Sequence, residues 1–80
     1  MKLVINGNEA QSKDGLTVAQ LLVEQKVKMP DMVSVELNGQ ILTRSDFDNI
    51  TLNEQDKVEF LYFMGGGESI KIRKLIINLY

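Results

Sequence analysis

Residues 56–67 read DKVEFLYFMGGG, and this stretch decides the fold. Residues 57–64 are mostly apolar and aromatic, which predicts the longest and most buried strand, placed at the centre of a sheet. Gly65, Gly66 and Gly67 follow directly. Three consecutive glycines lose more backbone entropy on ordering than any other tripeptide, so no strand or helix explains them. The sequence therefore predicts a central strand that passes straight into a thin backbone arm.

Upstream of this strand, two segments have the pattern of β-hairpins. In each, an alternating or β-branched run meets an Asn-Gly pair, which favours a tight turn because both residues tolerate positive φ. A short turn or fragment of tight helix around Ser45-Asp46-Phe47 returns an aromatic side chain to the core. The predicted hairpins consist of residues 2–5, Asn6-Gly7 and 9–13, and of residues 33–37, Asn38-Gly39 and 40–42.

One helix is predicted between the hairpins, from about Val18 to Lys26. Thr17 and Gln20 have the spacing of a capping box, in which each side chain bonds the other residue's backbone amide. The apolar positions of this helix form one stripe, so it packs a single face onto a sheet. The order strand, strand, helix, strand, strand, strand is that of an α+β domain. We expect a β-grasp fold, with a mixed sheet packed on one helix.

Composition excludes several classes of function. The 80 residues contain no cysteine and no histidine, which removes thiolate and imidazole metal sites and the usual nucleophile and base pairs. We predict no catalytic residue and no metal, and the carboxylates Glu36, Asp56 and Glu59 are expected to be solvated. Residues 1–67 carry six basic and ten acidic side chains, which argues against nucleic-acid binding. No apolar run is long enough to span a membrane, and a cytoplasmic protein is expected.

Three interpretations of the glycines remain open at this point. They could form a linker to the tail, residues 68–80. A phosphate-binding loop fits poorly, because neither a following helix nor the Lys and Ser/Thr of the Walker pattern is present. The third is a carboxyl arm, which a partner enzyme draws into a narrow channel and adenylates with ATP. Its extended backbone would pair with the channel wall as an added strand.

Residues 1–67 resemble the ThiS-type sulfur carriers of thiamin biosynthesis, small β-grasp proteins related to the MoaD-type carriers of molybdopterin synthesis and to ubiquitin. The resemblance is carried by residues 3–7 (LVING), 17–22 (TVAQLL), 35–39 (VELNG), 44–47 (RSDF) and 56–60 (DKVEF), followed by Gly66-Gly67. It implies that a ThiF-like adenylyltransferase activates Gly67 with ATP, that a thiocarboxylate forms there, and that thiazole synthase receives the sulfur. Gly65 and Gly66 would form the arm, and the carrier would bind no cofactor.

Two features depart from the resemblance. Family members usually have glycine in the turn before the last strand, where this chain has Glu54-Gln55-Asp56, so a different turn shape is expected. The family also generally ends near the diglycine, whereas residues 68–80 follow here and carry three basic and one acidic side chain. A peptide carbonyl at Gly67 cannot be adenylated. The tail therefore predicts a masked precursor that a protease cuts after Gly67, an arrangement also seen in carriers for cysteine or homocysteine synthesis.

The aromatic residues beside the arm are candidates for partner binding, because aromatic anchors dominate many interfaces. We assign this role to Phe60, Tyr62, Phe63 and Met64. Strand alternation places Phe60 and Tyr62 on one face and Leu61 and Phe63 on the other, so one pair is expected in the core and the other exposed. The alternative functions are a sulfur carrier for cysteine, homocysteine or molybdopterin synthesis made as a masked precursor, or a ubiquitin-like binding module without group transfer.

Overall fold

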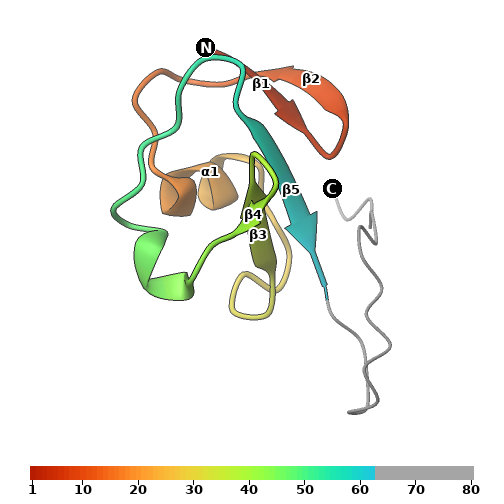
Figure 1. Ribbon diagram of the computed structural model, residues 1–80, viewed down its shortest axis with the longest axis vertical. Helices are drawn as coiled ribbons and strands as arrows, with labels where there is room; N and C mark the ends of the chain where they lie inside the picture. The colour runs from red at the N-terminus through yellow and green to blue at the C-terminus, as the bar shows by residue number, and fades with distance from the viewer. Residues whose placement is uncertain (63–80) are drawn as a thin grey trace.

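The structure is a computed structural model that describes residues 1–62. One helix packs against a five-stranded sheet with the strand order β2-β1-β5-β3-β4, as Figure 1 shows. The sheet is mixed, because β5 runs parallel to β1 and antiparallel to β3, while both hairpins are antiparallel. The elements are β1 (Lys2–Ile5), β2 (Asn8–Gln11), α1 (Val18–Glu24), β3 (Ser34–Leu37), β4 (Gln40–Ile41), the 3-10 helix η1 (Arg44–Asp46) and β5 (Lys57–Leu61).

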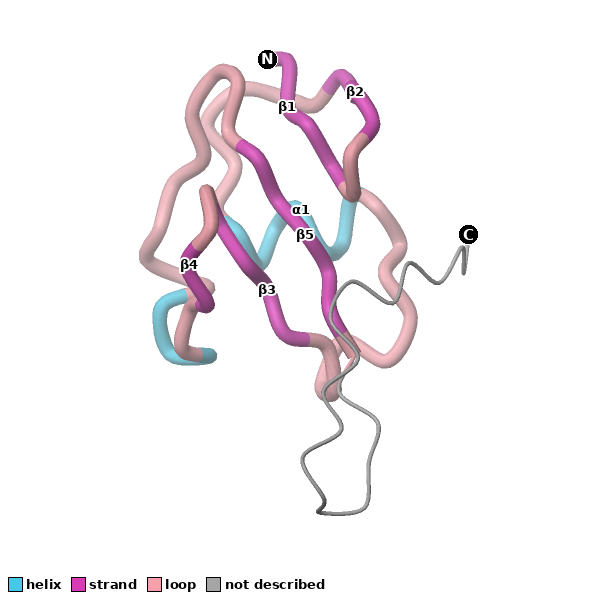
Figure 2. Tube along the Cα trace, turned by 45° about the vertical axis from the view of Figure 1, so that its right-hand side comes forward, coloured by secondary structure: helices cyan, strands magenta, loops and turns pink. Residues whose placement is uncertain are grey.

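The predicted central position of the last strand is confirmed. In the register of β5, Val58 lies beside Ile5 of β1 and beside Leu37 of β3. The strand ends at Leu61, three residues before the predicted end, and Met64 lies outside the described residues. The tube in Figure 2 shows β5 between β1 and β3, with α1 behind the sheet.

Helix α1 begins as predicted and ends two residues early. The Gln20 backbone amide donates to the Thr17 hydroxyl at 3.2 Å and the Thr17 backbone amide donates to the Gln20 side-chain oxygen Oε1 at 2.9 Å, which completes the capping box. At the other end, Lys26 adopts φ +55°, and the amides of Lys26 and Val27 donate to the carbonyls of Val23 and Leu22. This is a Schellman motif, which stops the helix at a left-handed residue.

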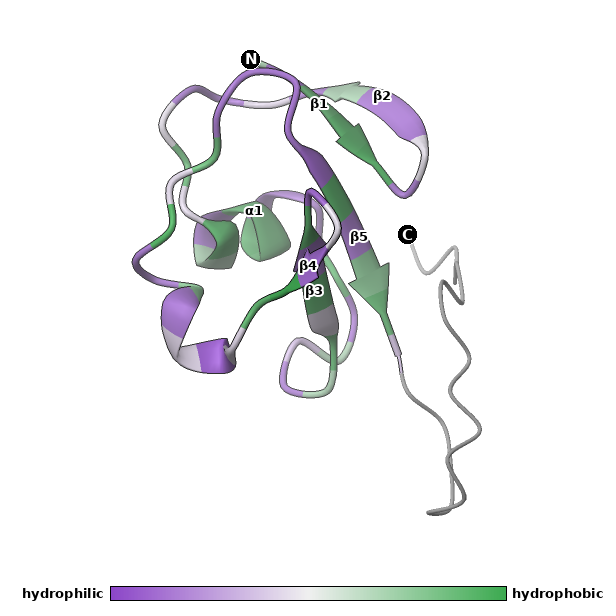
Figure 3. Cartoon of the chain, in the orientation of Figure 1, coloured by the Kyte–Doolittle hydropathy of each residue, from purple (hydrophilic) through white to green (hydrophobic). Residues whose placement is uncertain are grey.

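Apolar side chains from the helix, the sheet and the loop after η1 form one core. Figure 3 shows the hydrophobic colour along β1 and on α1, while β2 and η1 are mostly hydrophilic. The long segment between β4 and β5 contributes Phe47 and Leu52, so the 3-10 helix does return an aromatic residue to the core. The buried cluster comprises Leu3, Ile5, Val18, Leu21, Leu22, Val27, Val33, Val35, Phe47, Leu52, Val58, Phe60 and Tyr62.

The turn before β5 contains no glycine, but one of its residues has the positive φ angle that glycine favours. Gln55 adopts φ +71°, and its amide donates to the Lys2 carbonyl at 2.7 Å. The Asp56 carboxylate accepts the Asn53 amide at 2.8 Å and holds the turn from the other side. Gln55 therefore takes the left-handed conformation that glycine adopts most readily.

Two expectations about burial are wrong. Leu61 was expected to be exposed if Phe60 and Tyr62 were in the core, yet it is only 1% exposed, although it is not part of the core cluster. Glu36 was expected to be solvated and is 8% exposed. Glu36 lies on an inner strand between Ile41 of β4 and Glu59 of β5, and these cross-strand neighbours restrict solvent access to it. Leu61 lies opposite Ser34 of β3. Within residues 1–62, no helix is long and apolar enough to cross a membrane.

Candidate functional site

The candidate site is the end of β5, from which the chain continues toward Gly67. Phe63, Met64, Gly65, Gly66 and Gly67 were predicted to be functional, and all five lie outside the described residues. The structure does describe the two predicted residues that precede them, Phe60 and Tyr62. It therefore shows how the base of the arm is attached to the body.

On one side, the end of β5 is attached to the turn that follows β1. The Asn6 amide donates to the Val58 carbonyl at 2.9 Å, and the Asn6 side-chain carbonyl accepts the Phe60 amide at 2.9 Å. Asn6 can do both because it adopts φ +51° in the Asn6-Gly7 turn. Its side chain thus extends the hydrogen bonding along β5 by one step after β1 has ended at Ile5.

On the other side, the ladder with β3 ends where Ser34 lies opposite Leu61. The next residue, Tyr62, reaches the loop between α1 and β3, and its hydroxyl donates to the Lys28 carbonyl at 2.7 Å. Tyr62 is 8% exposed and Phe60 is 3% exposed, and both side chains belong to the core cluster. A partner would therefore not reach their ring faces at the surface, and the binding role assigned to them stays a prediction.

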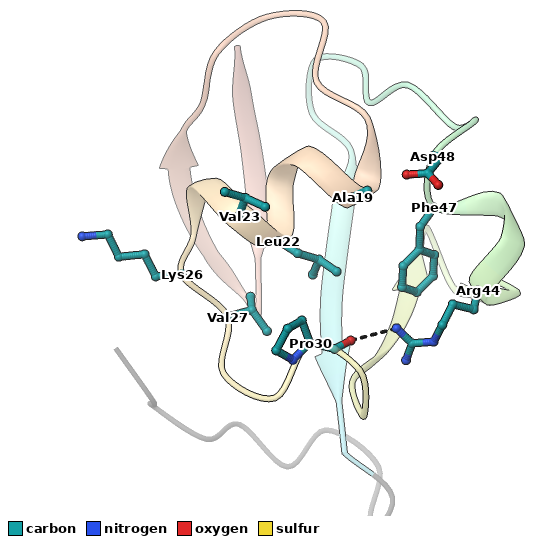
Figure 4. A pocket seen from close by; sticks show the side chains of 9 residues that line it. All are labelled: Ala19, Leu22, Val23, Lys26, Val27, Pro30, Arg44, Phe47 and Asp48. Atoms are coloured by element: carbon teal, nitrogen blue, oxygen red, sulfur yellow. Dashed lines mark hydrogen bonds between the residues drawn. The ribbon is translucent and has the colours of Figure 1, made fainter.

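The loop that receives Tyr62 is fastened by Arg44. The guanidinium of Arg44 donates to the Pro30 carbonyl at 2.8 Å and to the Val33 carbonyl at 2.5 Å. It also lies over the ring of Phe47, 5.0 Å from the ring centre, which is within the range of a cation–π contact. Figure 4 shows Arg44 pointing from the 3-10 helix toward Pro30.

Two concave surfaces occur on the described part of the molecule. A groove of about 420 Å³ lies between α1 and η1, and its wall includes Leu22, Val23, Val27, Pro30 and Phe47 (Figure 4). Apolar side chains make up most of its wall, and the charged residues Lys26, Arg44 and Asp48 line it as well.

A second hollow, of about 520 Å³, lies on the sheet face opposite α1 and is lined by Glu36, Asn38, Gly39, Lys57 and Glu59. Glu36 and Glu59 lie directly opposite each other on β3 and β5. No group of three or more Asp, Glu, His or Cys residues among residues 1–62 is arranged to hold a metal ion. We assign no catalytic role to either hollow.

Sequence reasoning missed the three side-chain contacts that attach the arm. Asn6 was interpreted only as a turn residue, Arg44 only as part of a family segment, and Tyr62 as an interface aromatic. The Asn6-Gly7 pair did contain one signal, because an asparagine in the left-handed region holds its side chain close to neighbouring backbone groups. The contacts of Arg44 and Tyr62 depend on how the loops are placed, which the sequence pattern does not reveal.

Comparisons with known proteins cover the same region. The sequence pattern of the ThiS family matches residues 3–67. A protein named thiazole synthase from Paramagnetospirillum magneticum is 42% identical over 67 residues, which are 84% of this chain and 20% of that protein. A thiazole synthase from Magnetococcus marinus is 32% identical over 68 residues, 85% of this chain and 21% of that protein. The chain thus spans about a fifth of the length of the curated relatives that it matches.

Solved structures give the same result. The crystal structure of the thiamine biosynthesis protein ThiS from Geobacter metallireducens is similar, with a TM-score of 0.81 and 46% identity, and the match covers 84% of this chain and 100% of that one. A solution structure of a thiamine biosynthesis protein from the same organism has a TM-score of 0.69 and covers 85% of this chain and 90% of that one. These matches confirm the predicted β-grasp fold. They also indicate that a region of this length folds as an independent chain.

Proposed function

The chain belongs to the ThiS family, and we propose that it is a sulfur carrier of thiamine biosynthesis that acts through Gly67. The observation that carries the proposal is the extent of the family match, which continues past β5 and ends at residue 67. The match therefore includes Gly65, Gly66 and Gly67. It favours the carboxyl arm over the linker interpretation of the three glycines.

The proposed chemistry requires only a free carboxylate at Gly67 and an accessible backbone. A carboxylate oxygen of Gly67 attacks the α-phosphorus of ATP, and pyrophosphate leaves. Sulfide then attacks the acyl carbon, and AMP leaves with the oxygen, so that a thiocarboxylate forms at Gly67. Glycine suits both steps, because the absence of a Cβ lets a channel close tightly around the backbone. The carrier contributes no catalytic side chain and binds no cofactor, since the activating partner binds ATP.

The partners follow from this chemistry. A ThiF-like adenylyltransferase would activate the arm, and a thiazole synthase would receive the sulfur. The second partner is supported by the relatives, because the region that resembles this chain forms about a fifth of two proteins named thiazole synthase. The proposal places the protein in the cytoplasm, where ATP is available to the activating enzyme. Carriers for molybdopterin, cysteine or homocysteine would use the same arm and different recipients.

The residues after Gly67 determine whether the arm is ready to react. With residues 68–80 attached, Gly67 has an amide carbonyl, which is a much weaker nucleophile toward ATP than a carboxylate. We therefore propose that a protease cuts after Gly67 before activation. This step divides the chain into a carrier, residues 1–67, and a removable extension, residues 68–80.

The test compares three purified chains: residues 1–80, residues 1–67 and residues 1–66. Each is incubated with ATP, a ThiF-like adenylyltransferase and a sulfide donor, and the products are measured by pyrophosphate release and intact mass. We expect residues 1–67 to release pyrophosphate and gain about 16 Da as sulfur replaces oxygen. Residues 1–66 are the matched control, because they keep the whole β-grasp body and a terminal glycine carboxylate but shorten the arm by one residue, ending at Gly66.

Each outcome bears on a separate part of the proposal. Activation of the chain that ends at Gly67, with none for the other two, supports both the carrier function and the masking. Activation of the uncut chain would contradict the masking. If residues 1–67 are not activated by an enzyme that activates the ThiS protein of Geobacter metallireducens, the carrier function is wrong and a binding module becomes the better explanation.

A further inference from the structure

Among residues 1–62, side chains hold the end of β5 on both sides. On the β1 side, the last described hydrogen bond is that of the Phe60 amide to Asn6. On the β3 side, the described ladder ends with the pair formed by Ser34 and Leu61. Tyr62 comes after both of these contacts in the sequence. Its hydroxyl bond to the Lys28 carbonyl, 2.7 Å long, is thus the last described hydrogen bond before Gly67.

The loop that provides this carbonyl is held on both sides of Lys28. Lys26 and Met29 adopt φ +55° and +53°, so the backbone turns sharply before and after it. Beyond Met29, the Arg44 guanidinium bonds the carbonyls of Pro30 and Val33. Two fixed points therefore define the position of the Lys28 carbonyl. A hydrogen bond to a carbonyl held in this way restrains direction as well as distance.

We propose that Tyr62 is a positioning residue, whose hydroxyl fixes the point and direction at which the arm leaves the body. This inference rests on the proposed function, because the arm is the part that the activating enzyme would receive. Five residues lead from Tyr62 to Gly67, and a fully extended segment of that length spans at most about 18 Å. The point at which the chain leaves the body therefore limits where the reacting carbonyl at its end can lie.

A single substitution can remove the hydroxyl of Tyr62 and keep its ring. The ring of Tyr62 lies in the core cluster, so Tyr62→Phe keeps the apolar packing and removes only the bond to Lys28. If the hydroxyl of Tyr62 had only a structural role, removing it would lower overall stability in the way that the loss of any other hydrogen bond does. Ser12→Ala is the matched control, because the Ser12 hydroxyl also makes a 2.7 Å bond, to Glu24 of α1.

The first measurement is amide hydrogen exchange on the full 80-residue chain, which does not depend on sulfur chemistry. In Tyr62→Phe we expect the Phe60 and Leu61 amides to exchange about three to ten times faster, the range that one lost hydrogen bond produces. Exchange in β1 and β2, far from the arm, should change far less. In Ser12→Ala, exchange at Phe60 and Leu61 should remain as in the parent.

The second measurement is activation of residues 1–67 by the ThiF-like enzyme. We expect Tyr62→Phe to raise KM for the carrier about three- to tenfold and to leave kcat within about twofold, because an arm that is not held in place must be ordered on binding. Ser12→Ala should change neither constant. Unchanged exchange at Phe60 and Leu61, or faster exchange with an unchanged KM, would overturn the positioning role. Absence of activation in the parent itself would overturn the proposed function, while the exchange result would still test the attachment.

Discussion

Replacing Gln55 by glycine should stabilise the protein, because Gln55 holds a backbone conformation that glycine adopts without steric cost. Gln55 lies at φ +71° in the turn before β5, and its side chain is exposed. A non-glycine residue in this left-handed region costs about 1–2 kcal/mol. The contact that fixes the turn, from the Gln55 amide to the Lys2 carbonyl, belongs to the backbone and survives the substitution.

The expected gain is smaller than the strain, since glycine also increases the entropy of the unfolded chain. That term costs about 0.5–1 kcal/mol. The net increase in the free energy of unfolding should therefore be about 0.5–1 kcal/mol. For a domain of this size, such a gain raises Tm by about 2–8 °C.

The assay is urea unfolding of the full chain, followed by far-ultraviolet circular dichroism. Asn53→Gly is the matched control, because Asn53 is an exposed residue of the same turn that does not have positive φ. It should lose about 0.5–1 kcal/mol through the entropy term alone. A Gln55→Gly variant that loses as much stability as Asn53→Gly would refute the reasoning, since the left-handed conformation at Gln55 would then store no strain.

Two further predictions concern other parts of the body. Asn6→Ala should lower the free energy of unfolding by about 2–4 kcal/mol, because it adds left-handed strain and leaves the Phe60 amide without its acceptor. Asn6→Asp keeps the tolerance of positive φ and the side-chain acceptor, so it should lower this free energy far less. Equal decreases for the two variants, measured by urea unfolding, would contradict this account. Partial burial opposes ionisation of Glu24, but hydrogen bonds led by that from the Ser12 hydroxyl outweigh it and lower the pKa of this carboxyl below its ordinary value of 4.5. Because the folded pKa is the lower one, this contribution is complete above the unfolded pKa and is lost as the pH falls through the folded pKa. Glu24→Gln should thus reduce stability more at neutral pH than in acid, and a difference that does not vary with pH would be inconsistent with the lowered pKa.

The arrangement of contacts separates two tasks within this small domain. The core and the sheet hold the body together, while Asn6, Tyr62 and Arg44 are concentrated around the base of the arm and the loop beside it. Substitutions of Tyr62 or Arg44 should therefore affect the arm more than the overall stability of the fold. Asn6 belongs to both, since its turn also closes the first hairpin.

The sequence alone determined the local structure of this protein and the order of its elements. The Asn6-Gly7 and Asn38-Gly39 pairs adopt the positive φ angles that their residue types favour, and Thr17 and Gln20 form the capping box. These features depend on residues within four positions of one another. The apolar run after Asp56 likewise predicted a central strand, because only a strand with neighbours on both sides buries so many apolar residues.

Only the tertiary structure decided what surrounds the base of the arm. Tyr62 bonds a carbonyl 34 positions earlier, and Arg44 bonds carbonyls 14 and 11 positions earlier. The burial of Glu36 depends on the strands on either side of it, and the left-handed Gln55 depends on the path from the η1 segment back to the Lys2 carbonyl. Residue type determines which local conformations have a low free energy. Contacts between distant segments exist only after the whole chain has packed, and they decide which polar group each side chain meets.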